Sequence, residues 1–289
     1  DVRVVLGIMF SDKVVDLLQD CPRGDRLLPA ALLINFCAHL RHYFAGHRPE
    51  GDVRWRPTAT EFVLVHSDVP SRRGLELFPE YKSEYAAKRR GDGPWGDVAR
   101  VVSDNIEIVQ LMAPMIPDFA LLDTGDLEPD CVPWLLEGGP DARPDHAVVL
   151  ASNNPNWAQL TDLYRSCLLT VKGDASKVYT YQTATDLLAE KSPAPNPVPS
   201  PHLEWVTAVR GCDKHSVPGV PGYGPVKSCK LVAGLGEPAD SAISGSRFLE
   251  LVHPARFTAE QAAVALRNRN LLSARVNSDE CTPLQRTHI

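Results

Sequence analysis

Apolar residues in the first two thirds of the chain form short continuous runs that alternate with longer stretches of helical spacing. The short runs, rich in Val, Ile and Leu, are typical of buried strands, and they predict strands at 2–10, 61–66, 119–122 and 147–151 and a hairpin at 168–171 and 178–181. The helical spacing predicts helices at 27–44 and 106–115. Strands that alternate with helices predict an α/β fold with a central, mostly parallel sheet flanked by helices. In such sheets, functional sites form beyond the carboxyl ends of the strands.

A proline-rich segment, residues 191–201 (KSPAPNPVPSP), follows the last predicted strand. Closely spaced prolines stiffen the backbone, so the segment is typical of an extended, exposed linker. Beyond it the pattern becomes helical. We therefore expect an α/β domain over residues 1–190, a linker or loop over 191–201 and a helical part over 202–289.

Composition narrows the class of protein. The chain has 289 residues, a net charge of −6, 44% hydrophobic and 23% charged residues, which is ordinary for a globular protein. No apolar run approaches the ~18 residues of a membrane span, and the first residues do not resemble a signal peptide. The seven cysteines are scattered, odd in number and without a CxxC pair, which is typical of reduced thiols. These features predict an intracellular protein with no membrane partner, without indicating a compartment.

The segment 209–231 (VRGCDKHSVPGVPGYGPVKSCKL) carries the most specific chemistry. A Gly-x-Pro-Gly-x-Gly turn at 219–224 precedes a predicted helix that starts near Pro225. Glycine lets the backbone approach a ligand closely, and the free N–H groups of a helix start attract phosphate. Lys227 and Lys230 add positive charge. The segment therefore predicts contact with a phosphate backbone, with a plain helix–helix turn as the alternative.

This segment resembles the helix-hairpin-helix-type turn of the 5′-to-3′ exonuclease and flap endonuclease family. Three further segments are similar to family motifs and occur in the family's order: 78–90 (FPEYKSEYAAKRR), 125–131 (GDLEPDC) and 151–160 (ASNNPNWAQL). The resemblance extends over roughly residues 2–272. It implies a PIN-like α/β domain followed by a helical C-terminal subdomain that carries the turn.

The resemblance also implies functional residues. Lys82 and Arg89 would contact the scissile phosphate as catalytic residues if the protein is active. The residues expected to contact nucleic acid are basic side chains and turn glycines: Arg72, Lys82, Lys88, Arg89, Arg90, Gly219, Gly222, Gly224, Lys227 and Lys230. Trp134, Trp157 and Trp205 lie beside apolar neighbours and are expected to pack in the core.

The family's metal site is only partly retained. A pair of Mg²⁺ ions requires several anionic oxygen ligands. The acids that remain near the family's metal-binding positions are Asp68, Glu128, Asp130 and Asp213, which predict a weak or lost metal site. The other family acids are replaced by Cys131, Asn154, Asn156, Cys212 and His215. An amide supplies no charge, and thiol and imidazole groups prefer softer ions such as Zn²⁺.

Several functional interpretations stay open. The first is a degenerate, catalytically inactive homologue, a pseudoenzyme without cofactor that binds the DNA or RNA backbone or serves as a subunit of a nucleoprotein assembly. The second is an active 5′ nuclease that uses Mg²⁺ or Mn²⁺. The third is a protein-interaction scaffold without nucleic-acid binding, which the net charge of −6 favours over the first. A site rebuilt for a softer metal from Asp130, Cys131, Cys212 and His215 is a further alternative.

Overall fold

The computed structural model describes residues 62–66, 71–83, 119–125, 127–132, 134, 148–161, 166–172, 175–239, 242–252 and 255–279. The chain divides into two compact units. Unit 1 contains residues 1–66, 86–123 and 171–176, and unit 2 contains residues 67–85, 124–170 and 177–289. The strand predicted at 2–10 and the helices predicted at 27–44 and 106–115 lie outside the described residues.

Unit 1 contains a parallel pair of strands. Strand β1 (Phe62–His66) pairs with β2 (Phe119–Asp123), from Phe62 opposite Phe119 to His66 opposite Asp123. Both strands are apolar runs, as expected of parallel strands, whose two faces are commonly covered. The predictions of strands at 61–66 and 119–122 are thereby confirmed.

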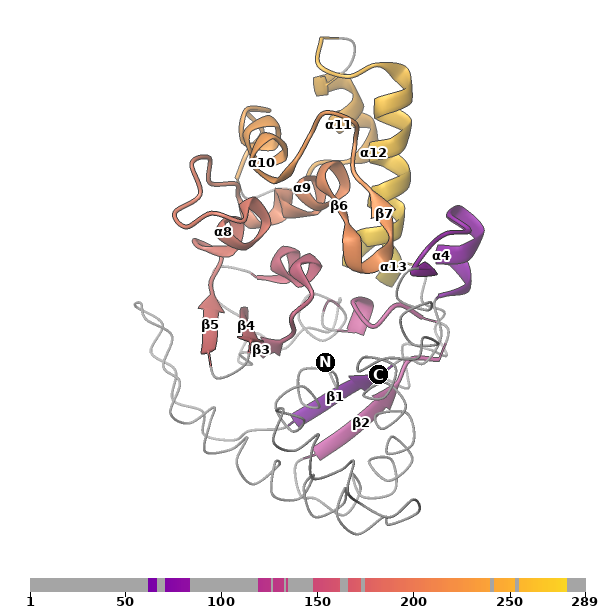
Figure 1. Cartoon of the computed structure of the whole chain (residues 1–289), viewed down its shortest axis with the longest axis vertical. Coiled ribbons are helices and arrows are strands. Elements are labelled where there is room, and N and C mark those ends of the chain that lie inside the picture. Colours follow the sequence, from indigo (N-terminus) through magenta and orange to yellow (C-terminus); the bar gives the residue numbers. More distant parts are fainter. Residues whose placement is uncertain are drawn as a thin grey trace. The chain divides into compact units, whose positions relative to one another are not determined.

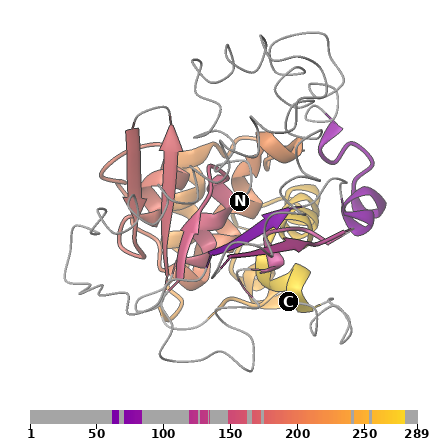
Figure 2. The same cartoon turned by 90° about the horizontal axis from the view of Figure 1, so that it is seen from below.

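A second sheet has the order β3–β4–β5, and β4 and β5 lie side by side in Figure 2. It comprises β3 (Val148–Ala151), β4 (Ser166–Lys172) and β5 (Ala175–Tyr179). Strands β3 and β4 are parallel, as predicted. Strand β5 ends at Tyr179 rather than at the predicted 181, because Thr180 already belongs to the turn into the next helix. The backbone N–H of Thr180 donates to the hydroxyl of Thr183 (3.0 Å).

Unit 2 is mainly helical after residue 180. Besides β3, the described elements that lie wholly in unit 2 are α4 (Arg72–Leu77), η2 (Pro155–Leu160), α8 (Ala184–Ala189), η3 (Ser200–His202), α9 (Leu203–Arg210), β6 (Gly211–Cys212), η4 (Asp213–His215), β7 (Val217–Pro218), α10 (Pro225–Ala233), α11 (Gly245–Val252), α12 (Ala259–Leu272) and α13 (Ala274–Asp279). Helix α9 packs against both α10 and α12 (Figure 1). On α9, the fully buried Trp205 stacks on Phe248 of α11 with ring centroids 3.8 Å apart. The fold class is therefore α/β with a helical C-terminal part, as predicted.

The proline-rich segment is packed in part against α8, although the sequence predicted an exposed linker. Val198 is buried, and its backbone N–H donates to the hydroxyl of Thr185 (3.0 Å). The backbone N–H of Ala194 donates to the carboxylate of Asp186 (2.8 Å). Polar side chains of α8 therefore hold a segment whose prolines lack donors of their own. The domain boundaries at 190 and 202 stay predictions.

Within the described residues, the structure contains no helix that combines the length and the hydropathy required to cross a membrane.

Candidate functional site

A cluster of buried polar side chains lies within unit 2. It brings together residues that are far apart in the sequence, and most of them are the candidate site residues predicted above. We call this group the buried polar cluster; its members are Tyr81, Lys82, Glu128, Asp130, Asn154, Asn156, Trp157 and His215. Burying a polar group costs free energy unless the group is hydrogen-bonded. The hydrogen bonds between these side chains therefore determine what the cluster can bind.

The centre of the cluster is an ion pair between Lys82 and Glu128. The ammonium of Lys82 donates to both carboxylate oxygens, at 2.9 and 3.2 Å, and the backbone N–H of Ser71 also donates to the carboxylate (3.4 Å). Lys82 is only 7% exposed and Glu128 only 5%. Burial alone would raise the pKa of Glu128, but the charges of Lys82 and His215 and the hydrogen bonds from Lys82 and Ser71 lower the pKa to about 2. Glu128 is therefore a carboxylate with its counter-charge already in place.

The backbone at Lys82 is held in an unusual conformation. Its φ angle is 58°, in the left-handed region that side chains other than glycine seldom adopt. The N–H of Lys82 donates to the backbone carbonyl of His215 (2.7 Å). This bond fixes the strained residue and joins the segment after α4 to the end of η4.

Asp130, the second acid of the cluster, is also held by protein donors. The indole N–H of Trp157 donates a short hydrogen bond to Oδ1, and the amide nitrogen of Asn154 lies 3.4 Å from both carboxylate oxygens. The orientation of the Asn154 amide is fixed, because its oxygen accepts from the backbone N–H of Asn156 and so caps η2. Its nitrogen must therefore point toward Asp130.

His215 and Tyr81 complete the cluster. The amide of Asn156 and Nδ1 of His215 form a hydrogen bond (3.1 Å), and the imidazole ring packs against the ring of Tyr81 with centroids 5.4 Å apart. The hydroxyl of Tyr81 is buried beside Glu128. Burial, together with the negative charges of Glu128 and Asp130 and a side-chain hydrogen bond with Glu128, raises the pKa of Tyr81 well above its usual value. Tyr81 therefore stays a neutral phenol beside the acids.

Among the described residues, the remaining predicted metal ligands do not complete a metal site. Asp213 is exposed on η4, and Asp68 lies outside the described residues. Cys131 and Cys212 are both buried, and burial raises the pKa of the Cys212 thiol. Among the residues that the structure describes, no group of three or more His, Cys, Asp or Glu side chains is arranged to hold a metal ion. The softer-metal interpretation thus has no support in this part of the chain.

The donor set of the cluster does not fit a pair of divalent ions. Within the part of the chain that the structure describes, Glu128 and Asp130 are the carboxylates of the cluster, and both already accept hydrogen bonds from the protein. The other side chains available there are amides, an indole, a phenol and an imidazole, none of which supplies negative charge. Hard dications require several anionic oxygens, which these residues do not provide.

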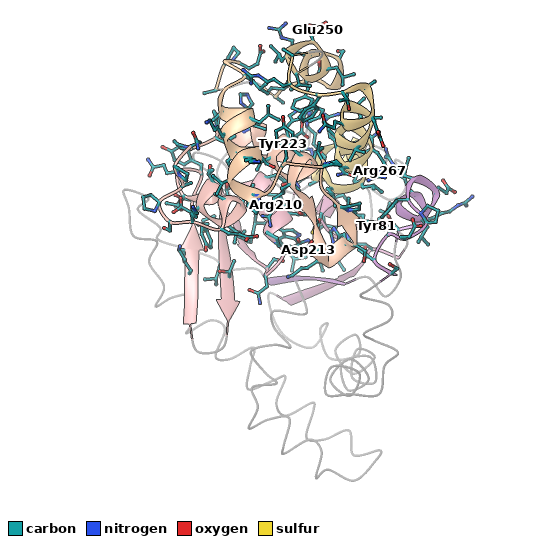
Figure 3. All side chains as sticks on the ribbon, turned by 45° about the horizontal axis from the view of Figure 1, so that its top comes forward. Tyr81, Arg210, Asp213, Tyr223, Glu250 and Arg267 are labelled. Carbon is teal, nitrogen blue, oxygen red and sulfur yellow. The ribbon has the colours of Figure 1, made fainter. Side chains whose placement is uncertain are left out.

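The predicted turn lies between β7 and α10. Gly222 has φ +87°, a conformation that favours glycine, and nothing lies within 4 Å of the position a Cβ would take. Gly224 precedes Pro225, the first residue of α10, and no side chain caps this helix start. Tyr223, which is labelled in Figure 3, holds the turn in place. Its hydroxyl donates to the carbonyl of Arg256 (3.1 Å), and its ring packs edge-on against the ring of Phe257. The backbone N–H groups at the start of α10 follow an exposed glycine turn.

Gly219 has a different role from the one the sequence suggested. A Cβ there would lie 2.3 Å from the carbonyl oxygen of Arg210, at the end of α9. Gly211 has φ +77°, and a Cβ there would lie 2.4 Å from the backbone nitrogen of Gly219. The close approach is thus between two parts of the chain, and it fixes the turn against α9.

The predicted basic residues differ in their surroundings. Lys227 and Lys230 are exposed on α10, and Lys227 donates to the carbonyl of Gly222 (3.2 Å). Arg72 is exposed on α4 and paired with Glu76 (2.9 Å). Lys82 belongs to the buried ion pair. Lys88, Arg89 and Arg90 lie outside the described residues.

Sequence reasoning missed three contributors to the site, Ser71, Tyr81 and Trp157. Trp157 was expected in the core; it is buried, but it is also a donor to Asp130. Its position beside Asn156, within a motif already assigned to the site, was a signal for this role. Ser71 donates to Glu128 through its backbone, and its hydroxyl accepts from Gly74 at the start of α4. No side-chain pattern could reveal a backbone donor.

The parallel strands, the glycine turn ahead of α10 and the cluster at the family's motif positions define the class of protein: the chain has the 5′-nuclease fold. Solved structures with this fold agree. A flap endonuclease of bacteriophage T5, in a pseudo-enzyme–product complex with DNA and metal ions, superposes with a TM-score of 0.59 at 14% identity, covering 85% of this chain and 80% of its own.

Two further bacteriophage T5 structures give the same picture. The T5 5′-exonuclease with bound zinc gives a TM-score of 0.57 at 14% identity, covering 86% of this chain and 82% of its own. A T5 protein co-crystallised with metal ions gives 0.61 at 14% identity, covering 90% and 88%. No protein-family model and no curated protein sequence matches the chain. At this level of identity the likeness shows the fold alone.

Proposed function

We propose that this protein binds the sugar–phosphate backbone of nucleic acid without cleaving it, as a catalytically degenerate member of the 5′-nuclease fold. It would act by itself or as a subunit of a nucleoprotein assembly. The observation that carries the proposal is that both acids of the buried polar cluster are held by protein donors.

Loss of cleavage follows from the balance of charge at the cluster. Metal-assisted phosphodiester hydrolysis depends on acids that are free to hold divalent cations. The carboxylate of Glu128 is neutralised by Lys82, and Asp130 is hydrogen-bonded by Trp157 and Asn154. A cation would have to displace these donors and leave the ammonium of Lys82 buried without a partner, which is strongly unfavourable.

Backbone binding is supported by the turn and helix α10. Helix α10 follows exposed glycines, and no side chain caps its start. Its first N–H groups and the positive end of its dipole are therefore available to an anion. Lys227 and Lys230 lie on the same helix with exposed side chains. One solved structure with the same fold is a complex with DNA. Such a contact is insensitive to sequence and weakens as salt rises.

A binding titration at two salt concentrations tests this proposal. Labelled single- and double-stranded DNA and RNA would be titrated with wild type, with the Lys227→Ala/Lys230→Ala variant and with Lys177→Ala. The last is a matched control, because Lys177 is exposed on β5 and its ammonium lies over the ring of Tyr179. We expect the double substitution to weaken binding and to reduce the salt dependence by about one unit of slope per lysine. The Lys177 variant should bind as wild type does.

The outcomes separate the alternatives. If wild type shows no salt-dependent binding to any of the four nucleic acids, the interaction-scaffold interpretation replaces the proposal. If binding is salt-dependent but unchanged by both lysine substitutions, the protein binds nucleic acid through a surface other than α10.

A further inference from the structure

We propose that the buried polar cluster is a metal-free replacement of a cation site, in which protein donors hold the acids in place of a metal, and that the amide of Asn154 determines this state. The inference goes beyond the proposed function, because it concerns how the fold is stabilised and does not depend on nucleic-acid binding. It predicts that one isosteric substitution makes the stability of the protein depend on divalent cations.

Each acid of the cluster has a donor where a cation would otherwise be needed. The ammonium of Lys82 supplies one full positive charge to Glu128, with bonds to both oxygens. Trp157 and Asn154 supply neutral N–H donors to Asp130. The same side chains link segments distant in sequence, so the cluster joins parts of unit 2 much as a bound ion does.

Asn154 is the neutral side chain that faces both carboxylate oxygens of Asp130. Its oxygen is committed to the backbone N–H of Asn156, so its nitrogen faces both oxygens of Asp130 at 3.4 Å. An aspartate would keep the shape and the helix cap, since Asp and Asn cap equally well. It would, however, replace the donor with an anionic oxygen beside a buried carboxylate.

Two buried carboxylates in contact repel each other unless a proton or a cation lies between them. Asn154→Asp therefore removes an attraction and creates a repulsion with almost no change in volume. A divalent cation relieves that repulsion, because it is coordinated by both acids at once. Cation binding to the folded state then raises its stability by mass action.

The experiment is thermal unfolding of the full chain, in EDTA and in excess Mg²⁺ or Mn²⁺. Wild type should give the same Tm in both. Asn154→Asp should unfold roughly 5–10 °C below wild type in EDTA and recover several degrees with the metal ion. The matched control is Asn153→Asp, which adds the same charge to an exposed neighbouring side chain and should show no metal dependence.

A second variant covers the case in which Asn154→Asp does not fold in EDTA. Lys82→Met removes the internal cation from Glu128 and should also acquire a Tm that rises with Mg²⁺ or Mn²⁺. The inference is overturned if wild type or Asn153→Asp shows a metal-dependent Tm. It is equally overturned if neither cluster variant gains one. None of these outcomes affects the nucleic-acid titration, so the two proposals fail separately.

Discussion

The ammonium of Lys82 lies 2.9 Å from one carboxylate oxygen of Glu128, and both side chains are almost completely buried. The resemblance in the sequence implied Lys82 as a phosphate contact and Glu128 as a metal ligand. In this structure each is the partner of the other. The charge of each side chain is therefore balanced within the protein.

Replacing one partner of this ion pair should lower the free energy of unfolding more than replacing both partners. Lys82→Met leaves a buried, uncompensated carboxylate, and we expect a loss of about 3–5 kcal/mol in the free energy of unfolding. Glu128→Gln leaves the ammonium without its partner and should also destabilise. The double variant Lys82→Met/Glu128→Gln should be more stable than Lys82→Met alone. Denaturant unfolding of the four proteins measures the coupling; additive losses would contradict the ion-pair assignment.

The lowered pKa of Glu128 makes stability depend on pH in a defined direction. Its pKa falls from 4.5 to about 2 on folding, so the carboxylate stabilises the folded protein above pH 4.5. That contribution is lost as the pH falls from about 4.5 toward 2, because protons then bind the unfolded chain preferentially. It amounts to roughly 3 kcal/mol at neutral pH. The free energy of unfolding, measured across this pH range, should depend less steeply on pH for Glu128→Gln than for wild type.

The contact between Gly219 and α9 predicts a position that tolerates no side chain. A Cβ at Gly219 meets the carbonyl oxygen of Arg210 at 2.3 Å, and Gly219→Ala should cost about 1–3 kcal/mol through displacement of backbone. Gly224→Ala is the matched control, since nothing lies within 4 Å of its added methyl group. It should cost roughly 0.5 kcal/mol, the effect of replacing glycine at a helix start. Equal losses in the two variants would show that close packing at Gly219 is not the cause.

The sequence was sufficient for the fold class and for six of the eight members of the buried polar cluster. Short apolar runs located β1, β2, β3 and the β4–β5 hairpin, because a strand that is buried on both faces is apolar at consecutive positions. Motif order placed Lys82, Glu128, Asp130, Asn154, Asn156 and His215 at one site, and unit 2 brings their side chains together.

What the sequence did not reveal is how these residues pair. The resemblance to the nuclease family implied Lys82 as a phosphate contact. Its burial depends on Glu128, 46 residues away, and on a backbone bond to His215. The same limit applies to the proline-rich segment, where Thr185 and Asp186 of α8 hold the backbone. Pairing between distant side chains is a property of tertiary packing, and no local pattern encodes it.

The central claim, binding without cleavage, is tested most directly by incubating the purified full chain with flap and nicked-duplex DNA in Mg²⁺ or Mn²⁺ under conditions where binding is observed. We expect the protein to bind the DNA and to leave it uncut. Cleavage that requires the metal and disappears in Asp130→Ala would contradict this claim and establish an active 5′ nuclease.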